Sequence, residues 1–205
     1  MEFNKIKNKG QARLFKNDYL EMVTKTHPVV IYSIYFPIIA FLLYYAHAYK
    51  NIIYSKEIFL FITGVFCWTL FEYILHRWIF HMVVESTRAK KIIYAIHGVH
   101  HEFPRDKERL FMPPVPSIII AFAFFSFWYF TMGWNVLAFF PGFVFGYLIY
   151  GSMHFAIHAF TPPVFLKALW RNHHLHHYKF PSKGFGVSSV LWDLVFRTIP
   201  HKDEA

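Results

Sequence analysis

Four long apolar stretches constrain the fold of this chain most strongly. They cover residues 29–48, 57–80, 115–132 and 135–158 of a 205-residue sequence that is 56% hydrophobic and 22% aromatic. Each approaches or exceeds the roughly 17–25 residues that a helix needs to cross the hydrocarbon core of a bilayer. Only a few residues around Gly133 separate the third stretch from the fourth, which predicts a tight hairpin. We therefore expect an all-α integral membrane protein with four transmembrane helices.

The distribution of positive charge predicts how these helices cross the membrane. The net charge is +9, and the basic residues flank the apolar stretches, so we expect a membrane surface as partner and no nucleic acid. With the N-terminus inside, Lys50 and Lys56 fall in outside loops, and the other 19 of the 21 Lys and Arg lie inside. The positive-inside rule thus predicts cytoplasmic N- and C-termini and a cytosolic helical cap formed by residues 82–114 and 161–205. The membrane would be a bacterial plasma (inner) membrane or a eukaryotic endoplasmic reticulum.

The N-terminal segment, residues 1–28, is basic and leaves two interpretations open. It could form an interfacial amphipathic helix, or it could be an extended basic tail. Because residues 1–27 are polar and basic, we expect no cleavable signal peptide. We assign residues 29–205 to a single domain. The one cysteine, Cys67, excludes both an intrachain disulfide and a thiolate metal cluster.

Ten of the 14 histidines form four tight clusters. Imidazole is the commonest protein metal ligand, and ten are too many for one ion of about four to six ligands but suit two ions. The clusters end the second and fourth stretches or lie in the two cytosolic segments, so all four reach one membrane boundary. This predicts a shared dimetal site at that boundary. The clusters are His76 and His81; His97, His100 and His101; His154 and His158; and His173, His176 and His177.

Helical spacing predicts how the clusters point. Residues at i, i+3 and i+4 share a helix face, so three of the four clusters can each aim their imidazoles at one point. His76 and His81 are five residues apart, which a regular helix separates by about 140°. They can converge if the helix ends or bulges between them; we favour the alternative that they serve different metals. We expect His27, His47, His174 and His201 to stay outside the site, and ligand type does not choose among zinc, copper, iron and nickel.

Three carboxylates are candidates for orienting the imidazole rings. Glu72 lies one turn before His76, Asp106 follows the second cluster, and Asp193 follows the fourth. Carboxylates that accept a hydrogen bond from a metal-bound imidazole fix its orientation. The alternative, a salt-bridge or interfacial charge, is equally open for each.

The histidine pattern HX4H, HX2HH, HX3H, HX2HH resembles that of the membrane fatty acid hydroxylase superfamily, which includes sterol desaturases and carotenoid hydroxylases. The resemblance covers roughly residues 55–200 and is closest to the fatty acid 2-hydroxylase branch. The segments that carry this finer resemblance are HGVHHEFPRDKERLFMPP at 97–114, HHLHHY at 173–178, GFGVSS at 184–189 and WDLVF at 192–196.

The resemblance implies a four-helix membrane anchor under a cytosolic helical cap, and a diiron site that zinc can occupy in purified members. It implies O2-dependent hydroxylation at C2 of a long acyl chain, free or within a ceramide-type sphingolipid. Some members carry a fused cytochrome b5 domain; since this sequence shows none, we expect a separate electron donor such as a cytochrome b5 or a ferredoxin. The implied ligands are His76, His81, His97, His100, His101, His154, His158, His173, His176 and His177.

Around the site we expect an aromatic wall for the acyl chain and cations for an anionic head group. The aromatic candidates are Tyr150, Phe155, Trp170, Tyr178, Phe185 and Trp192, and the cationic ones are Arg105, Lys107, Arg109 and Lys179. Ordinary packing or a solvated charge is the alternative for each.

Other functions remain open at this point. A desaturase, or a sterol or carotenoid hydroxylase, would share the histidine clusters. A histidine-rich metal transporter or metal-binding protein would place its ligands along a path near the bilayer midplane, whereas these collect at one boundary. A dizinc hydrolase would need a general base, for which Glu102 is the candidate.

Overall fold

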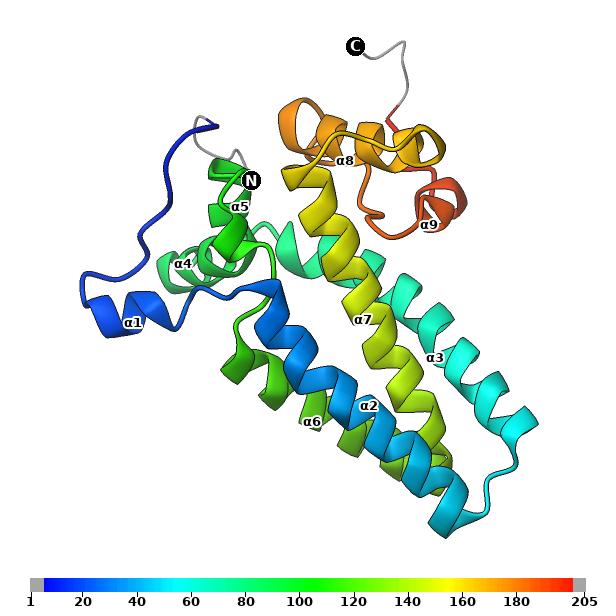
Figure 1. The fold of residues 1–205 in the computed structure, drawn as a ribbon. Coiled ribbons are helices and arrows are strands. Elements are labelled where there is room, and N and C mark those ends of the chain that lie inside the picture. The colour runs from blue at the N-terminus through cyan, green and yellow to red at the C-terminus, as the bar shows by residue number, and fades with distance from the viewer. Residues whose placement is uncertain (1–5, 201–205) are drawn as a thin grey trace.

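The computed structural model describes residues 6–200, and every regular element in that range is helical. Residues 1–5 and 201–205, with His201 and the first residues of the basic segment, lie outside the described range. Figure 1 shows long helices that form an elongated bundle and shorter helices gathered at one end. The long helices are α2 (Pro28–Lys50), α3 (Tyr54–Ile74) with its π-helical extension η1 (Leu75–Phe80), α6 (Pro114–Met132) and α7 (Val136–Ala159).

The shorter elements lie between and after the long helices. They are α1 (Asp18–Met22), α4 (Thr87–Ile93), the π-helix η2 (Tyr94–Gly98), α5 (Val99–Glu102), the 3-10 helices η3 (Lys107–Arg109), η4 (Gly133–Asn135) and η5 (Val164–Leu166), α8 (Lys167–Tyr178) and α9 (Leu191–Val195). Within residues 6–200, the two segments expected to form a cap contain short helices joined by irregular chain. In residues 6–27 only the five residues of α1 are helical, and the rest of this described part has no regular structure.

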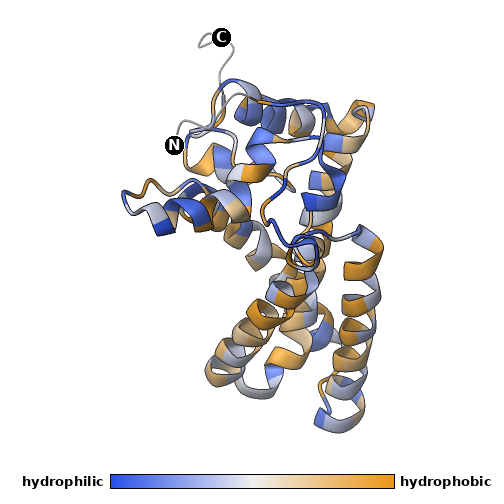
Figure 2. Cartoon of the chain, turned by 90° about the vertical axis from the view of Figure 1, so that its left-hand side faces the viewer, coloured by the Kyte–Doolittle hydropathy of each residue, from blue (hydrophilic) through white to orange (hydrophobic). Residues whose placement is uncertain are grey.

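Three helical runs within residues 6–200 are long and apolar enough to cross a membrane. They are Pro28–Lys50, Tyr54–Phe80 and Lys107–Ala159, and the last contains both α6 and α7. The chain turns between these two helices at Gly133, whose φ of +56° suits glycine. Ring contacts from α6 to α7, such as Trp128 to Phe139 at 5.0 Å between centroids, confirm the predicted hairpin. Figure 2 shows hydrophobic residues concentrated along the long helices and hydrophilic ones around the shorter helices.

Helix α7 is the centre of the bundle and contacts α2, α3 and α6. Its first half is buried on all sides, which explains why it is apolar all round rather than amphipathic. Glycines bring α3 and α7 into backbone contact: a Cβ on Gly142 would lie 1.9 Å from the Phe61 carbonyl oxygen, and one on Gly64 would lie 2.2 Å from that of Phe139. This close packing fixes how the ends of α3 and α7 meet, and both ends carry histidines.

Candidate metal centre

The four histidine clusters converge into two adjoining groups of five. Within each group, one nitrogen from every ring lies within 4.8 Å of the others. The groups touch through the rings of His101 and His177, which stack with centroids 4.1 Å apart. The first group is His76, His81, His97, His101 and His176, and the second is His100, His154, His158, His173 and His177.

His76 and His81 belong to the same group because the helix between them is a π-helix. The segment η1 follows α3 without a break, and its hydrogen bonds run from residue i to i+5. The wider turn brings the two rings within 5.2 Å between centroids. Our preference for different metals was therefore wrong, and the alternative of a helix that bulges between them is what the structure shows.

Each of the two HX2HH clusters contributes histidines to both groups. The spacing instead predicted that all imidazoles of one cluster would point to the same place. On α5, neighbouring residues are about 100° apart, so His100 and His101 diverge. His101 and His97 belong to the first group, and their Nε2 atoms are 2.9 Å apart. His100 belongs to the second group. On α8, His176 belongs to the first group and His173 to the second. The two helices thus hold the groups together.

Backbone carbonyls hold three of the rings. The Nδ1–H group of His76 donates to the Phe185 carbonyl at 2.6 Å, and that of His176 donates to the Lys183 carbonyl at 2.7 Å. His154 donates in the same way to the Leu110 carbonyl at 3.3 Å. A carbonyl only accepts, so each of these rings carries its proton on Nδ1 and presents a lone pair on Nε2.

The Nε2 atoms of several rings converge inside each group. The Nε2 atom of His100 lies 2.8 Å from that of His154 and 3.0 Å from that of His177. The Nε2 atom of His176 is buried and has no hydrogen-bond partner within residues 6–200. Converging lone pairs repel one another unless a cation lies among them. All-imidazole groups also suit borderline transition metals such as iron and zinc, so these residues fit metal ions.

Burial keeps the histidines in the form that binds metal. It lowers the pKa of His97, His100 and His173 well below the usual value, and the positive charge of neighbouring imidazoles lowers it further. The same two causes, burial first, lower the pKa of His81 to about 2. These rings are therefore neutral at pH 7, and neutral imidazole is the metal-binding form.

Glu72 and Asp193 hold the loop that supplies two of the accepting carbonyls. Glu72 accepts from the backbone N–H groups of Val187 at 3.1 Å and Ser188 at 2.8 Å. Asp193 is fully buried and accepts from the backbone N–H groups of Phe185 at 2.9 Å and Gly186 at 2.8 Å. Both carboxylates thus contact the backbone of the loop rather than an imidazole ring, and they act on the histidines through its carbonyls.

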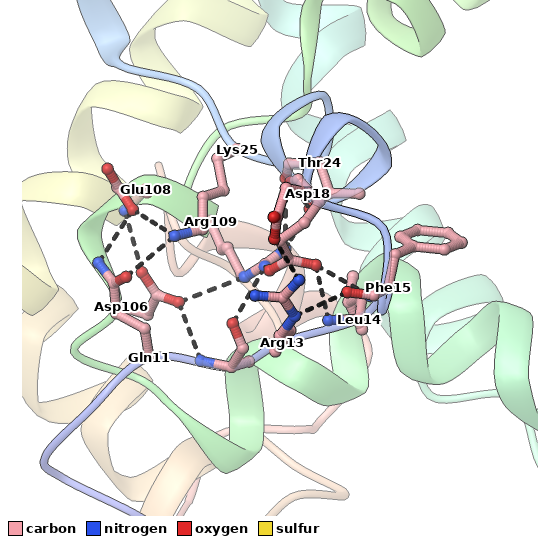
Figure 3. Close-up of polar contacts among 12 residues, drawn as sticks. Gln11, Arg13, Leu14, Phe15, Asp18, Thr24, Lys25, Asp106, Glu108 and Arg109 are labelled. Carbon is pink, nitrogen blue, oxygen red and sulfur yellow. Dashed lines mark hydrogen bonds and ion pairs between the residues drawn. The ribbon is translucent and has the colours of Figure 1, made fainter.

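Asp106 belongs to a polar cluster that fastens the N-terminal segment to the chain after α5 (Figure 3). It accepts from the Ala12 backbone N–H at 3.4 Å and pairs with Arg109 at 3.3 Å. The Arg109 side chain is only 4% exposed and also pairs with Glu21. Arg109 is therefore a structural cation, which corrects its assignment to a lipid head group.

A second contact of the N-terminal segment reaches α5 beside the histidines. The Lys7 ammonium donates to Glu102 at 2.6 Å, and the Tyr94 hydroxyl donates to the other carboxylate oxygen at 2.7 Å. Burial raises the pKa of Glu102, but these two hydrogen bonds and the charge of Lys7 outweigh it, so the net shift is downward. Glu102 is held as an anion by two donors, which does not suit a general base.

The expected aromatic wall is only partly at the site. Phe185 packs against His76, His81 and His176, with ring centroids 5.4–5.7 Å apart. Tyr150 stacks on His154 at 5.7 Å. Phe155 and Lys107, an expected wall residue and an expected cation, line one cavity of about 330 Å³ beside the start of α2. Trp170 donates to the Phe160 carbonyl, Tyr178 to Asn8, and Trp192 to Thr69, so these three lie in other contacts.

Sequence reasoning missed the backbone part of the site. The carbonyls of Leu110, Lys183 and Phe185 have no side-chain signature, and Asn172, which donates to Asp193 at 3.0 Å, lies next to a cluster without being singled out. The GFGVSS segment was the available signal. Its Gly186 leaves room for Asp193, because a Cβ there would lie 2.8 Å from a carboxylate oxygen.

Comparison with known proteins decides the family. The sequence profile described as fatty acid hydroxylase matches residues 61–198. The chain belongs to the fatty acid hydroxylase family. Within it, the ceramide very long chain fatty acid hydroxylase SCS7 of Saccharomyces cerevisiae is 40% identical over 195 residues, which cover 93% of this chain and 50% of that protein. The dihydroceramide fatty acyl 2-hydroxylase FAH1 of Arabidopsis thaliana is 33% identical over 207 residues, with 95% and 83% covered.

A solved structure has the same fold. It is described as full length scs7p with only the hydroxylase domain visible, and it superposes with a TM-score of 0.88 at 39% identity. The match covers 95% of this chain and 74% of that one. This fatty acid hydroxylase family member therefore spans half the length of the yeast relative and most of the part of scs7p that is visible.

Proposed function

We propose that this chain is a membrane-embedded dimetal oxygenase that hydroxylates C2 of a long-chain fatty acid or of the acyl chain of a ceramide-type sphingolipid. The observation that carries the proposal is the pair of adjoining, buried groups of five histidines. Support also comes from relatives whose names specify ceramide fatty acids and the 2-position. We further propose residues 29–205 as the hydroxylase domain.

Each group of histidines is proposed to hold one metal ion, iron in the active enzyme, with zinc able to occupy the same imidazoles. The bound metals would supply the redox chemistry with O2, in which one oxygen atom enters the C–H bond and the other leaves as water. Two electrons and two protons balance this reaction, and a separate donor, a cytochrome b5-like protein or a ferredoxin, would provide the electrons. An unactivated C–H bond requires such a cofactor because no protein side chain oxidises it.

The chain's own residues would orient and enclose the reacting carbon. The Lys183 and Phe185 carbonyls fix two rings of the first group, so that their Nε2 atoms face inward. Phe185 and Tyr150 cover the histidines with apolar surface that excludes water and suits an acyl chain. Lys107, in the cavity that Phe155 lines, is the proposed contact for a polar head group.

The proposed topology has four crossings, made by α2, α3, α6 and α7, with both termini and the shorter helices other than η4 on the cytoplasmic side. Both groups of histidines lie where α3 and α7 end, so an amphiphile could keep its head group near water while its acyl chain stays in lipid. A transporter would place ligands along a path through the bilayer. A hydrolase would need a free base, and Glu102 is engaged by Lys7 and Tyr94.

Mass spectrometry of lipids after growth with 18O2 tests this function. Cells expressing the chain should accumulate fatty acyl chains with 18O at C2, and cells expressing the His100→Ala/His176→Ala variant should not. His174→Ala is the matched control, because His174 is in the same cluster but in neither group. An absence of labelled product, in a host shown to supply electrons and with metal bound to the protein, would contradict 2-hydroxylation. Unsaturated products would instead indicate a desaturase.

A further inference from the structure

The short helix α9 packs beside the apolar span formed by α3 rather than beyond its end. The Trp192 indole N–H donates to the Thr69 hydroxyl at 3.0 Å, and its ring packs on Phe66 at 5.7 Å between centroids. Phe196, directly after α9, stacks on Tyr73 at 5.2 Å. Phe66 precedes the end of α3 at Ile74 by eight residues, or about 12 Å at 1.5 Å per residue. Contacts of α9 therefore reach well down the side of a helix that is long and apolar enough to cross a membrane.

The side of α9 that faces away from the protein is apolar and exposed. Leu194 is 60% exposed and Val195 is 56% exposed, and Leu191 and Phe196 are each 40% exposed. A single exposed leucine is ordinary, but Leu191, Leu194 and Val195 share one helix face, and with the partly exposed Phe196 beside them they form a patch. Asp193, the only charged residue of α9, is fully buried on the opposite side. The outer face of α9 thus has the composition of a surface that contacts lipid.

The residues around this patch favour a bilayer over a protein partner. The patch continues the exposed apolar surface of α3, where Phe59 is 66% exposed and Phe66 is 52% exposed. Two arginines border it: the Arg77 guanidinium lies 6.0 Å from the Phe196 ring, and Arg197 follows Phe196 in the sequence. Tryptophan with flanking arginine is typical of the depth at which acyl chains meet phosphate head groups.

We propose that α9 is a membrane-embedded helix, and that Leu191, Leu194, Val195 and Phe196 contact the acyl chains of the bilayer beside α3. The C-terminal segment then lies only partly in the cytosol. The same five-residue helix carries Asp193, which binds the loop that positions His76 and His176. Helix α9 therefore joins the proposed lipid-contacting face to the loop beside the metal centre.

Site-directed spin labelling of the full chain in phosphatidylcholine nanodiscs tests this proposal. In a Cys67→Ser background, a nitroxide is attached to Leu194→Cys, and its collision rates with O2 and with a water-soluble nickel chelate are compared. Phe59→Cys on α3 is the lipid-facing control. Arg171→Cys, on the exposed side of α8, is the water-facing control.

We expect the Leu194 label to collide preferentially with O2, with an O2-to-nickel ratio close to that of the Phe59 label and several-fold above that of the Arg171 label. A ratio like that of Arg171 would overturn the proposal, as would a Phe59 label that is itself accessible to nickel. A label shielded from both reagents would assign the face to a protein partner instead. If the Leu194→Cys protein does not fold, Val195→Cys tests the same face.

Discussion

At the scale of single residues, the centre depends on which nitrogen of each ring carries the proton. The carbonyls of Phe185, Lys183 and Leu110 bind the Nδ1–H groups of His76, His176 and His154, and so direct their lone pairs inward. Backbone carbonyls do this without adding charge, whereas carboxylates beside the rings would raise their pKa. The carboxylates Glu72 and Asp193 do not contact these rings; they accept hydrogen bonds from the backbone of the loop that supplies the Lys183 and Phe185 carbonyls.

The Asp193→Asn substitution should weaken metal binding without touching a ligand. The new side-chain amide would present an N–H group to the backbone donors at Phe185 and Gly186, so at least one buried hydrogen bond to a charged acceptor is lost. We expect the free energy of unfolding to fall by about 3 kcal/mol and metal affinity to fall about 10- to 100-fold. Chelator competition and chemical unfolding measure the two quantities, and wild-type metal affinity would contradict the role given to the loop.

The sequence was sufficient to find the ten histidines but not to divide them. Their clustering is visible because four HX2–4H spacings are improbable without a shared ligand. The division depends on how α5 and α8 are oriented relative to the ends of α3 and α7, since His100 and His101 diverge on one helix and each lies with histidines of other elements. Crossing angles come from side-chain packing over the whole bundle, and no local pattern records them. The carbonyl acceptors were not predictable either, because every residue has one.

At the scale of elements, two π-helices and one extended segment shape the site. The π-helix η1 brings His76 and His81 together, and η2 leads into α5. The extended segment before α1 is fastened to the chain after α5 by the polar cluster of Arg109 (Figure 3). The four apolar stretches agree to within three residues with the long helices when η1 is counted with α3, because long runs of apolar residues favour continuous helix. A π-turn depends on tertiary contacts, so the sequence pattern did not reveal it.

The Arg109→Met substitution should destabilise the protein far more than Arg13→Met. Arg109 pairs with Glu21 and Asp106, and its side chain is 4% exposed, so removing it leaves two buried carboxylates with backbone N–H donors but without this cation. We expect a loss of about 3–5 kcal/mol in the free energy of unfolding. Arg13 pairs with Asp18 on the surface in the same cluster, where the expected loss is no more than about 1 kcal/mol. Equal losses in urea unfolding would show that the buried cluster does not anchor the N-terminal segment.

At the scale of the whole molecule, the long helices and the shorter helices together enclose ten imidazoles in one place. Burial, followed by the charge of neighbouring rings, lowers the pKa of residues such as His101 and His177 well below 6.5. The unfolded chain has histidine pKa values near 6.5. Above that pH both states are neutral, and below it only the unfolded chain takes up protons. The stability of the metal-free protein is therefore complete above pH 6.5 and falls as the pH is lowered.

Thermal unfolding of chelator-treated protein between pH 8 and pH 5 checks this dependence. The melting temperature should stay level from pH 8 to pH 7 and fall progressively below pH 6.5. Each low-pKa histidine lowers the free energy of unfolding by about 1.4 kcal/mol per pH unit in that range, so the fall should be steep. A melting temperature that is unchanged or higher at pH 5 would mean that the rings take up protons in the folded state.

The most direct test of the account is the number of metal ions bound per chain, measured by inductively coupled plasma mass spectrometry after loading with iron(II) under anaerobic conditions. We predict two per chain for the wild type, and two for His174→Ala, since His174 is in neither group. His176→Ala should retain one ion, in the second group, and His173→Ala should retain one, in the first. One ion per wild-type chain, or the loss of both ions in each single variant, would contradict two separate five-histidine sites.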